Sequence, residues 1–148
     1  MNAKLIVVGG LVFYVVTFIV SFATGPLIHT GVLEADYRAT AEFWRPELRQ
    51  DPPDMAALMP RWIASGIVSA LVLAGIFGAI RGALSGAAWM KGLKFGFIAS
   101  LFMCTFCLGW SGVFNLPDKI WMWWALESFL YYLPGGAALG WVAGKVAP

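Results

Sequence analysis

Charged residues are scarce in this chain, which has 10 Lys and Arg, 8 Asp and Glu and one His among its 148 residues. With 12% charged and 60% hydrophobic residues, the chain cannot surround a core with a water-facing surface, which excludes a soluble domain of any size. The net charge is only +2 and the basic residues are scattered, so nucleic acid is not an expected partner.

Potential ligands and nucleophiles are equally few. A single histidine, His29, cannot supply the paired ligands of a membrane b-type haem or a usual zinc set, so we expect neither metal nor cofactor. We expect His29 to form hydrogen bonds at the membrane interface instead. The sequence also lacks a phosphate-binding glycine loop, a nucleophile elbow and a paired-acid arrangement. We therefore expect a protein that is not an enzyme.

The chain does contain four long apolar runs. Residues 5–28, 62–80 and 95–117 contain no Asp, Glu, Lys or Arg, and residues 120–144 contain only Glu127. As a helix, each run reaches about 30 Å, because the rise is roughly 1.5 Å per residue, and this matches the hydrocarbon core. Backbone groups in lipid must pair within their own segment. The sequence therefore predicts one all-α domain over residues 1–148, an integral membrane bundle of four transmembrane helices.

The first run also has features of a secretory signal, since Lys4 precedes it and residues 21–23 have small-x-small spacing. It is long for a signal, so we expect a retained helix. Basic residues divide evenly between the two sides of the predicted membrane, but Arg81, Lys91 and Lys94 crowd one short loop. This density predicts that both termini lie in the cytoplasm.

Residues 29–60 are the largest predicted extramembrane segment. Apolar and aromatic residues at three- and four-residue steps predict a short helix on the membrane surface: Leu33, Tyr37, Thr40 and Trp44. Pro46 should end that helix, and a restart at Asp54 or Pro60 should lead into the second span. Four charged residues of this segment are candidates for docking another protein: Arg38, Arg45, Glu47 and Arg49.

Tryptophans gather near the predicted outer surface, where an aromatic belt anchors membrane helices. The belt consists of Trp44, Trp62, Trp110, Trp121, Trp123 and Trp124.

Small residues recur at every fourth position in the spans, which lets helices approach closely in lipid, where water cannot drive them together. The second span contributes Gly66, Ala70, Ala74 and Gly78, and the series continues to Gly82 and Gly86. The third contributes Gly92, Gly96, Ser100 and Cys104, and the fourth contributes Gly136, Gly140 and Gly144.

Glu127 is the main candidate for chemistry, because a carboxylate inside hydrocarbon is costly unless it is protonated or paired. Such residues often mark proton or cation pathways. The structural alternative is a hydrogen bond to Tyr131, to a Ser or Thr, or to water. Gly136 is about 180° around the helix from Glu127. If Glu127 points into the bundle, we expect a second protein chain on the face of Gly136, Gly140 and Gly144.

Cys104 and Cys107 form a C-x-x-C pair, which in a soluble redox fold indicates thiol–disulfide exchange. Inside a span, an uninterrupted helix holds the two sulfurs poorly for a bond. Quinone-linked disulfide-forming membrane enzymes need a second cysteine pair, and this chain has two cysteines in all. Apolar packing is the favoured interpretation, and a redox role is the alternative.

Three short segments carry a resemblance. They are Gly31-Val32-Leu33 with the nearby Asp36-Tyr37 and Arg45-Pro46-Glu47, residues 91–96 (KGLKFG), and residues 134–141 (PGGAALGW). In these segments the chain resembles a set of small bacterial four-helix membrane proteins of unknown function. The resemblance implies the fold and a location in the bacterial inner membrane, and it implies no activity. Small multidrug exporters also use one membrane glutamate, but theirs lies in the first helix, whereas Glu127 lies in the fourth.

These observations predict an accessory or assembly subunit that packs against other membrane chains in a larger complex, with membrane lipid around it. A small oligomeric proton-coupled transporter or channel centred on Glu127 is the second hypothesis. A membrane thiol redox protein using Cys104 and Cys107 is the third.

Overall fold

The computed structural model describes residues 2–147, which form helices and turns without a strand. This confirms the predicted all-α class. Met1 and Pro148, the ends of the predicted domain, lie outside the described residues. The elements are η1 (Leu5–Gly9), α1 (Gly10–Gly25), η2 (Pro26–Val32), α2 (Glu34–Ala39), η3 (Ala41–Phe43), η4 (Pro46–Arg49), α3 (Met55–Ile80), η5 (Arg81–Ala83), α4 (Ala88–Trp110) and α5 (Asp118–Val146).

Three helical segments in residues 2–147 are long and apolar enough to cross a membrane: Leu5–Val32, Met55–Ala83 and Ala88–Trp110. The first joins η1, α1 and η2 into one continuous helix. The fourth long helix, α5, has 29 residues but is not apolar enough to be a candidate span. The structure therefore contains three candidate spans, with α5 packed among them.

The helix ends differ from the predicted spans. α4 begins at Ala88 and ends at Trp110, whereas the uncharged run predicted 95–117. Absence of charge is a poor guide to helix ends, because residues 111–117 carry no charge yet form a turn and irregular backbone between α4 and α5. α3 begins at Met55, where Asp54 accepts a hydrogen bond from the Ala57 backbone N–H at 3.1 Å. Of the two predicted restarts, Asp54 is therefore correct, and Pro60 lies inside α3.

The surface helix is shorter than the predicted one, which continues past Trp44 to Pro46. α2 ends at Ala39, a 3₁₀ turn follows, and Trp44 is extended, before Pro46 is reached. The Trp44 indole N–H reaches the Tyr37 carbonyl and the Thr40 hydroxyl, at 3.1 Å each. Leu33, Tyr37, Thr40 and Trp44 therefore lie close together because the chain bends after α2, and not because they share one face of a helix.

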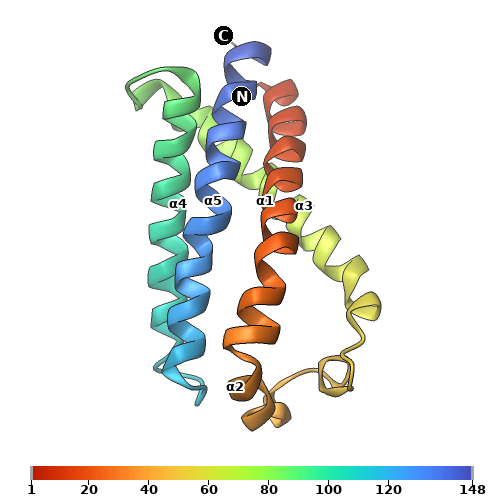
Figure 1. Ribbon diagram of the computed structural model, residues 1–148. Coiled ribbons are helices and arrows are strands. Elements are labelled where there is room, and N and C mark those ends of the chain that lie inside the picture. The colour runs from red at the N-terminus through yellow and green to blue at the C-terminus, as the bar shows by residue number, and fades with distance from the viewer. Residues whose placement is uncertain (1, 148) are drawn as a thin grey trace.

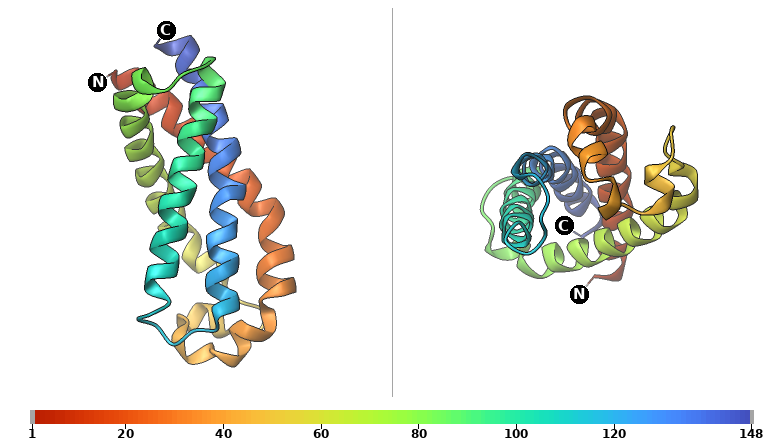
Figure 2. Two further views of the ribbon diagram at one scale, coloured as in Figure 1. Left: turned by 90° about the vertical axis from the view of Figure 1, so that its left-hand side faces the viewer. Right: turned by 90° about the horizontal axis from the view of Figure 1, so that it is seen from below.

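α5 is the central helix. It lies along α4 and against α1, and α1 in turn crosses α3 (Figure 1). Viewed from below, α3 runs at an angle along one side of the other helices (Figure 2). Its first half diverges from α1, and residues 60–65 are all exposed. Both termini lie at the end of the molecule opposite α2 (Figure 1).

The core lies where α1, α3 and α5 meet, at fully buried side chains that include Leu5, Phe77 and Leu139. Large apolar side chains also cover the outside, for example Phe22 (75% exposed) and Phe102 (68%). A soluble monomer rarely exposes so continuous an apolar surface. This surface agrees with lipid around the bundle.

Candidate functional site around Glu127

The glycine seams of α4 and α5 face each other within the chain. A Cβ built at Gly92 would overlap the Gly136 carbonyl oxygen, and one at Gly140 would lie 2.7 Å from the Gly92 Cα. The expectation of a second chain on the Gly136 face is therefore wrong. Because α5 is central, its glycine face meets α4 while its Glu127 face meets the end of the first helix.

The other small residues divide into two groups. Ala70 and Ala74 are buried where α1 crosses α3, and a Cβ at Gly66 would meet the Tyr14 ring at 2.7 Å. Gly82 and Gly86 lie beyond the end of α3, so they are not part of its seam. Gly78 lies near Leu5, and a Cβ at Gly144 would meet that of Ala88 at 2.8 Å.

A pair of serines ties α4 to α5 deeper in the same seam. The Ser100 hydroxyl donates to the Gly96 carbonyl at 2.8 Å and reaches the Ser128 carbonyl at 3.2 Å. The Ser128 hydroxyl in turn reaches the Ser100 carbonyl at 3.2 Å. Both side chains are buried. These bonds satisfy polar groups that would be costly in an apolar interior.

Glu127 is buried in α5, with 5% of its surface exposed. The Tyr131 hydroxyl, one helical turn on, donates to Glu127 Oε1 at 2.5 Å. His29 Nε2, from η2, lies 3.1 Å from the same oxygen. The His29 side chain is 38% exposed. A buried carboxylate is thus joined to the outside of the protein through one imidazole.

The chain of contacts continues from His29 into α2. His29 Nδ1 lies 2.8 Å from the Tyr37 hydroxyl, which accepts a hydrogen bond from the Trp124 indole N–H at 2.9 Å. Burial raises the pKa of Tyr37 to about 12, and the charges of Glu127 and Asp36 add to this effect against the opposing Trp124 bond. Tyr37 is therefore neutral at physiological pH and can donate its proton in a hydrogen bond.

These contacts are compatible with the following protonation pattern, which is the one we use below. Trp124 donates to Tyr37, Tyr37 donates to Nδ1 of a neutral His29, and Nε2–H donates to an ionised Glu127. The donors then all point toward the carboxylate. In the other tautomer of the neutral ring, Nδ1–H would donate to the Tyr37 hydroxyl and Nε2 would accept a proton from a neutral Glu127, because the two nitrogens of a neutral imidazole have opposite roles.

Neighbouring contacts hold this cluster in place. The Lys119 ammonium, at the start of α5, lies 3.0 Å from Asp36 Oδ2 and donates to the Val32 carbonyl at 2.8 Å. Ile28, Leu33 and Ile120 form a buried apolar cluster beside these bonds. The polar contacts therefore rest on packing between η2, α2 and α5.

The polar cluster is bounded on its inner side by apolar packing. Ser21 and Thr24 of α1 come close to the Tyr131 hydroxyl. Toward the termini, the contact between α1 and α5 continues with the stacked rings of Phe13 and Tyr132 and then with buried Leu139. The cluster therefore faces the α2 end of the molecule.

The other predicted site residues lie apart from Glu127. Cys104 and Cys107 are free and partly exposed on α4, and the described residues contain no group of three potential metal ligands. The loop arginines bind within their own segment: Arg38 pairs with Glu34 at 2.7 Å and Arg45 with Glu47 at 3.0 Å. Arg49 donates to the Trp44 and Glu42 carbonyls. The Arg45 hydrogen bond also lowers the pKa of the partly exposed Glu47.

Comparison with known proteins found no match to a family model, a curated protein or a solved structure. The resemblance to small bacterial four-helix membrane proteins stays a prediction.

Proposed function

We propose that this is a four-span membrane protein, with α5 as the fourth span and both termini in the cytoplasm, that carries protons across the membrane through Glu127. The observation that carries the proposal is the contact between a buried carboxylate and a partly exposed imidazole. Membrane carboxylates with such partners are typical of proton pathways. The closed glycine seam between α4 and α5 removes the main argument for an accessory subunit, and this favours the proton hypothesis.

Proton uptake in this proposal takes two steps. Water delivers a proton to His29 Nδ1, and the Tyr37 hydroxyl turns to accept a hydrogen bond from it. The imidazolium then passes its Nε2 proton to Glu127 Oε1. One proton has moved from water to the carboxylate, and the imidazole is neutral again in its other tautomer. Tyr37 stays neutral throughout, as its pKa of about 12 requires.

Release on the other side needs a change in the helices. A neutral Glu127 loses its charge-assisted bond to His29, which loosens the contact between α5 and η2. Pro134 lies in α5 seven residues further on and cannot donate a backbone hydrogen bond. The helix is therefore easiest to bend there. Bending at Pro134 would separate the apolar contacts of Phe13, Tyr132 and Leu139, which now close the path of a proton from Glu127 toward the termini.

The test is proton flux into vesicles that contain the purified protein and an internal pH-sensitive dye, under an imposed pH gradient. We expect Glu127→Gln to slow the protein-dependent flux at least about tenfold, the size of effect typical of a lost proton carrier. Asp118→Asn is the matched control, because it makes the same change at the start of the same helix. Wild-type flux no faster than in empty vesicles, or normal flux in Glu127→Gln, would refute the proposal.

A second candidate, an accessory subunit of a larger complex, is supported by the first half of α3. Residues 60–65 are exposed on every side, including Trp62 at 40%, and this half diverges from α1 (Figure 1). A helix of another membrane protein would pack there. Native mass spectrometry after gentle extraction from the native membrane tests this candidate. Co-release of unrelated subunits is expected, and a monomer or homo-oligomer alone would count against it.

A further inference from the structure

Charge is distributed unequally between the two ends of the molecule. The end with the termini holds five basic residues: Lys4, Arg81, Lys91, Lys94 and Lys145. The acidic side chains lie at the α2 end, in residues 34–54, at Asp118 and at Glu127 (Figure 1). Among the described residues, therefore, no acidic side chain neutralises the basic end.

A cavity of about 520 Å³ opens at this basic end, between the end of α3, the start of α4 and the end of α5. Arg81 and Lys91 line it, and both are partly buried. Neither forms an ion pair with a residue in 2–147. One guanidinium N–H of Arg81 reaches the Ala143 carbonyl at 3.4 Å, and a guanidinium has five such donors. Donors are thus left for a ligand.

Small residues keep this cavity open. Its lining includes Gly82, Gly86, Gly140 and Gly144. A Cβ at Gly82 would meet nothing within 4 Å. Gly86 has a φ of +108°, a conformation that other residues rarely adopt, and it lets the chain turn tightly from η5 into α4. The backbone therefore leaves space beside the two cations.

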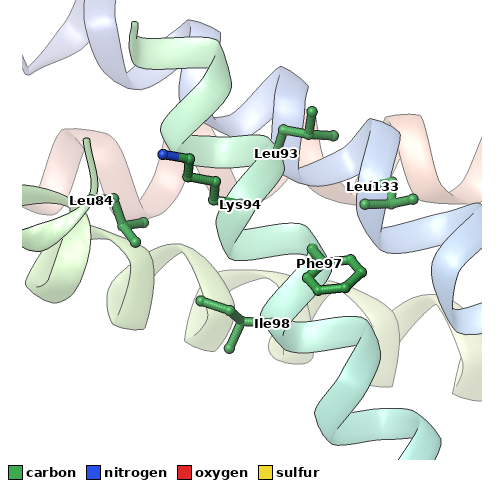
Figure 3. A pocket seen from close by; sticks show the side chains of 6 residues that line it. All are labelled: Leu84, Leu93, Lys94, Phe97, Ile98 and Leu133. Atoms are coloured by element: carbon green, nitrogen blue, oxygen red, sulfur yellow. The ribbon is translucent and has the colours of Figure 1, made fainter. Parts of the chain in front are cut away.

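A second hollow lies farther along α4 and is apolar. It has a volume of about 540 Å³ and is lined by Leu84, Leu93, Lys94, Phe97, Ile98 and Leu133 (Figure 3). The Lys94 ammonium donates to the carbonyl and hydroxyl oxygens of Ser85, both at 2.9 Å. Its charge therefore stays at the turn, while its aliphatic stem borders the apolar hollow.

We propose that the basic cavity binds the phosphate of an anionic phospholipid, whose acyl chains lie along the apolar hollow beside α4. Arginine and lysine bind phosphate oxygens through charge-assisted hydrogen bonds, and basic pockets between membrane helices select anionic headgroups. A soluble phosphate would use the cations alone. The apolar hollow on the next turns of the same helix favours a lipid.

Native mass spectrometry of the purified chain tests this site by titration with phosphatidylglycerol or with phosphatidylcholine of the same acyl chains. We expect phosphatidylglycerol to bind at least about tenfold more tightly. Each cation near a membrane surface contributes about fivefold, so the double variant Arg81→Gln/Lys91→Gln should bind roughly 30-fold more weakly. Lys4→Gln/Lys145→Gln removes the same charge at the same end but outside the cavity, and should change binding less than about threefold.

Two further measurements keep the test decisive. Lys91→Gln alone removes a side chain that forms no hydrogen bond with any residue in 2–147, so it should fold and still lose about fivefold in affinity. Inorganic phosphate in large excess should not displace the lipid. Equal binding of the two lipids, unchanged binding by the Lys91 variant, an equal loss in the control variant, or displacement by inorganic phosphate would each overturn the proposal.

Discussion

Tyr37 has both polar and aromatic contacts in the His29–Glu127 cluster. Its hydroxyl contacts His29 and Trp124, while its ring stacks on His29 with centroids 5.8 Å apart and meets Trp44 edge to face at 5.1 Å. Removing the hydroxyl leaves the ring packing intact but leaves two polar nitrogens without this partner. The hydroxyl can therefore be tested separately from the ring.

We predict that Tyr37→Phe lowers the free energy of unfolding at neutral pH by about 1–3 kcal/mol, because partly buried polar groups lose their partner. The pH dependence follows from the raised pKa. Since the neutral form is favoured in the folded protein, the contribution of Tyr37 is fully present below about pH 10 and is lost as the pH rises through about 12. Wild type should thus lose stability more steeply over this range than the variant.

Thermal unfolding in detergent, followed by circular dichroism at several pH values, measures both effects. Tyr14→Phe is the control, because Tyr14 lies against Gly66, away from the cluster. If wild type and Tyr37→Phe lost stability in parallel above pH 10, ionisation of Tyr37 would not destabilise the folded protein, and the prediction would be wrong.

The sequence predicted part of this cluster. An acid alone in an apolar run identifies Glu127, and the spacing of one helical turn identifies Tyr131 as its neighbour. It did not predict the contact between Glu127 and His29, because these residues are far apart in the chain and meet only through the packing of α5 against η2. One signal was available: the only histidine and the only acid of the four apolar runs lie near the same predicted membrane surface.

At the scale of elements, the contact between α4 and α5 depends on backbone approach. Gly92 and Gly96 face Gly136 and Gly140 so closely that added Cβ atoms would overlap backbone atoms of the opposite helix. The four-residue spacing predicted small-residue seams but not their partners, because such a pattern is the same whether the opposite helix belongs to this chain or another. Only the position of α5 among its neighbours decides this.

Gly96→Ala should therefore separate the two helices. Its Cβ would overlap the Tyr132 carbonyl oxygen and lie 3.3 Å from the Gly136 Cα. Backbone cannot move aside as a side chain can, so we expect a loss of about 1–3 kcal/mol in the free energy of unfolding, as for other overpacked sites. Denaturation in detergent micelles measures this loss.

Gly109→Ala is the matched control in the same helix, because a Cβ there would meet nothing within 4 Å. Alanine favours helix by about 0.5–1 kcal/mol over glycine, so this variant should be as stable as wild type or slightly more so. Equal stability of the two variants would show that the close approach of α4 and α5 is not needed for folding.

For the whole molecule, the decisive question is whether α5 crosses the membrane. It is long enough, and it packs against α4 and α1, but Glu127 and its many Trp, Tyr, Gly and Pro residues lower its mean hydropathy. The least apolar residues of α5 are shielded from lipid by packing, because Glu127, Ser128 and three glycines (Gly135, Gly136 and Gly140) are buried against protein. Apolar side chains such as Met122 and Leu126 face outward. We therefore expect α5 to span.

Cysteine labelling in a Cys104→Ala/Cys107→Ala background tests this topology. Asn115→Cys lies in the turn between α4 and α5, and Ala83→Cys lies in η5, near the termini. An impermeant thiol reagent added outside intact cells should label Asn115→Cys at once and label Ala83→Cys only after lysis. A third site, Ala147→Cys, should behave like Ala83→Cys, because α5 brings the chain back across the bilayer. Labelling of Ala147→Cys from the same side as Asn115→Cys would mean that α5 does not cross the membrane. Transport of protons across the membrane through Glu127 would then be excluded.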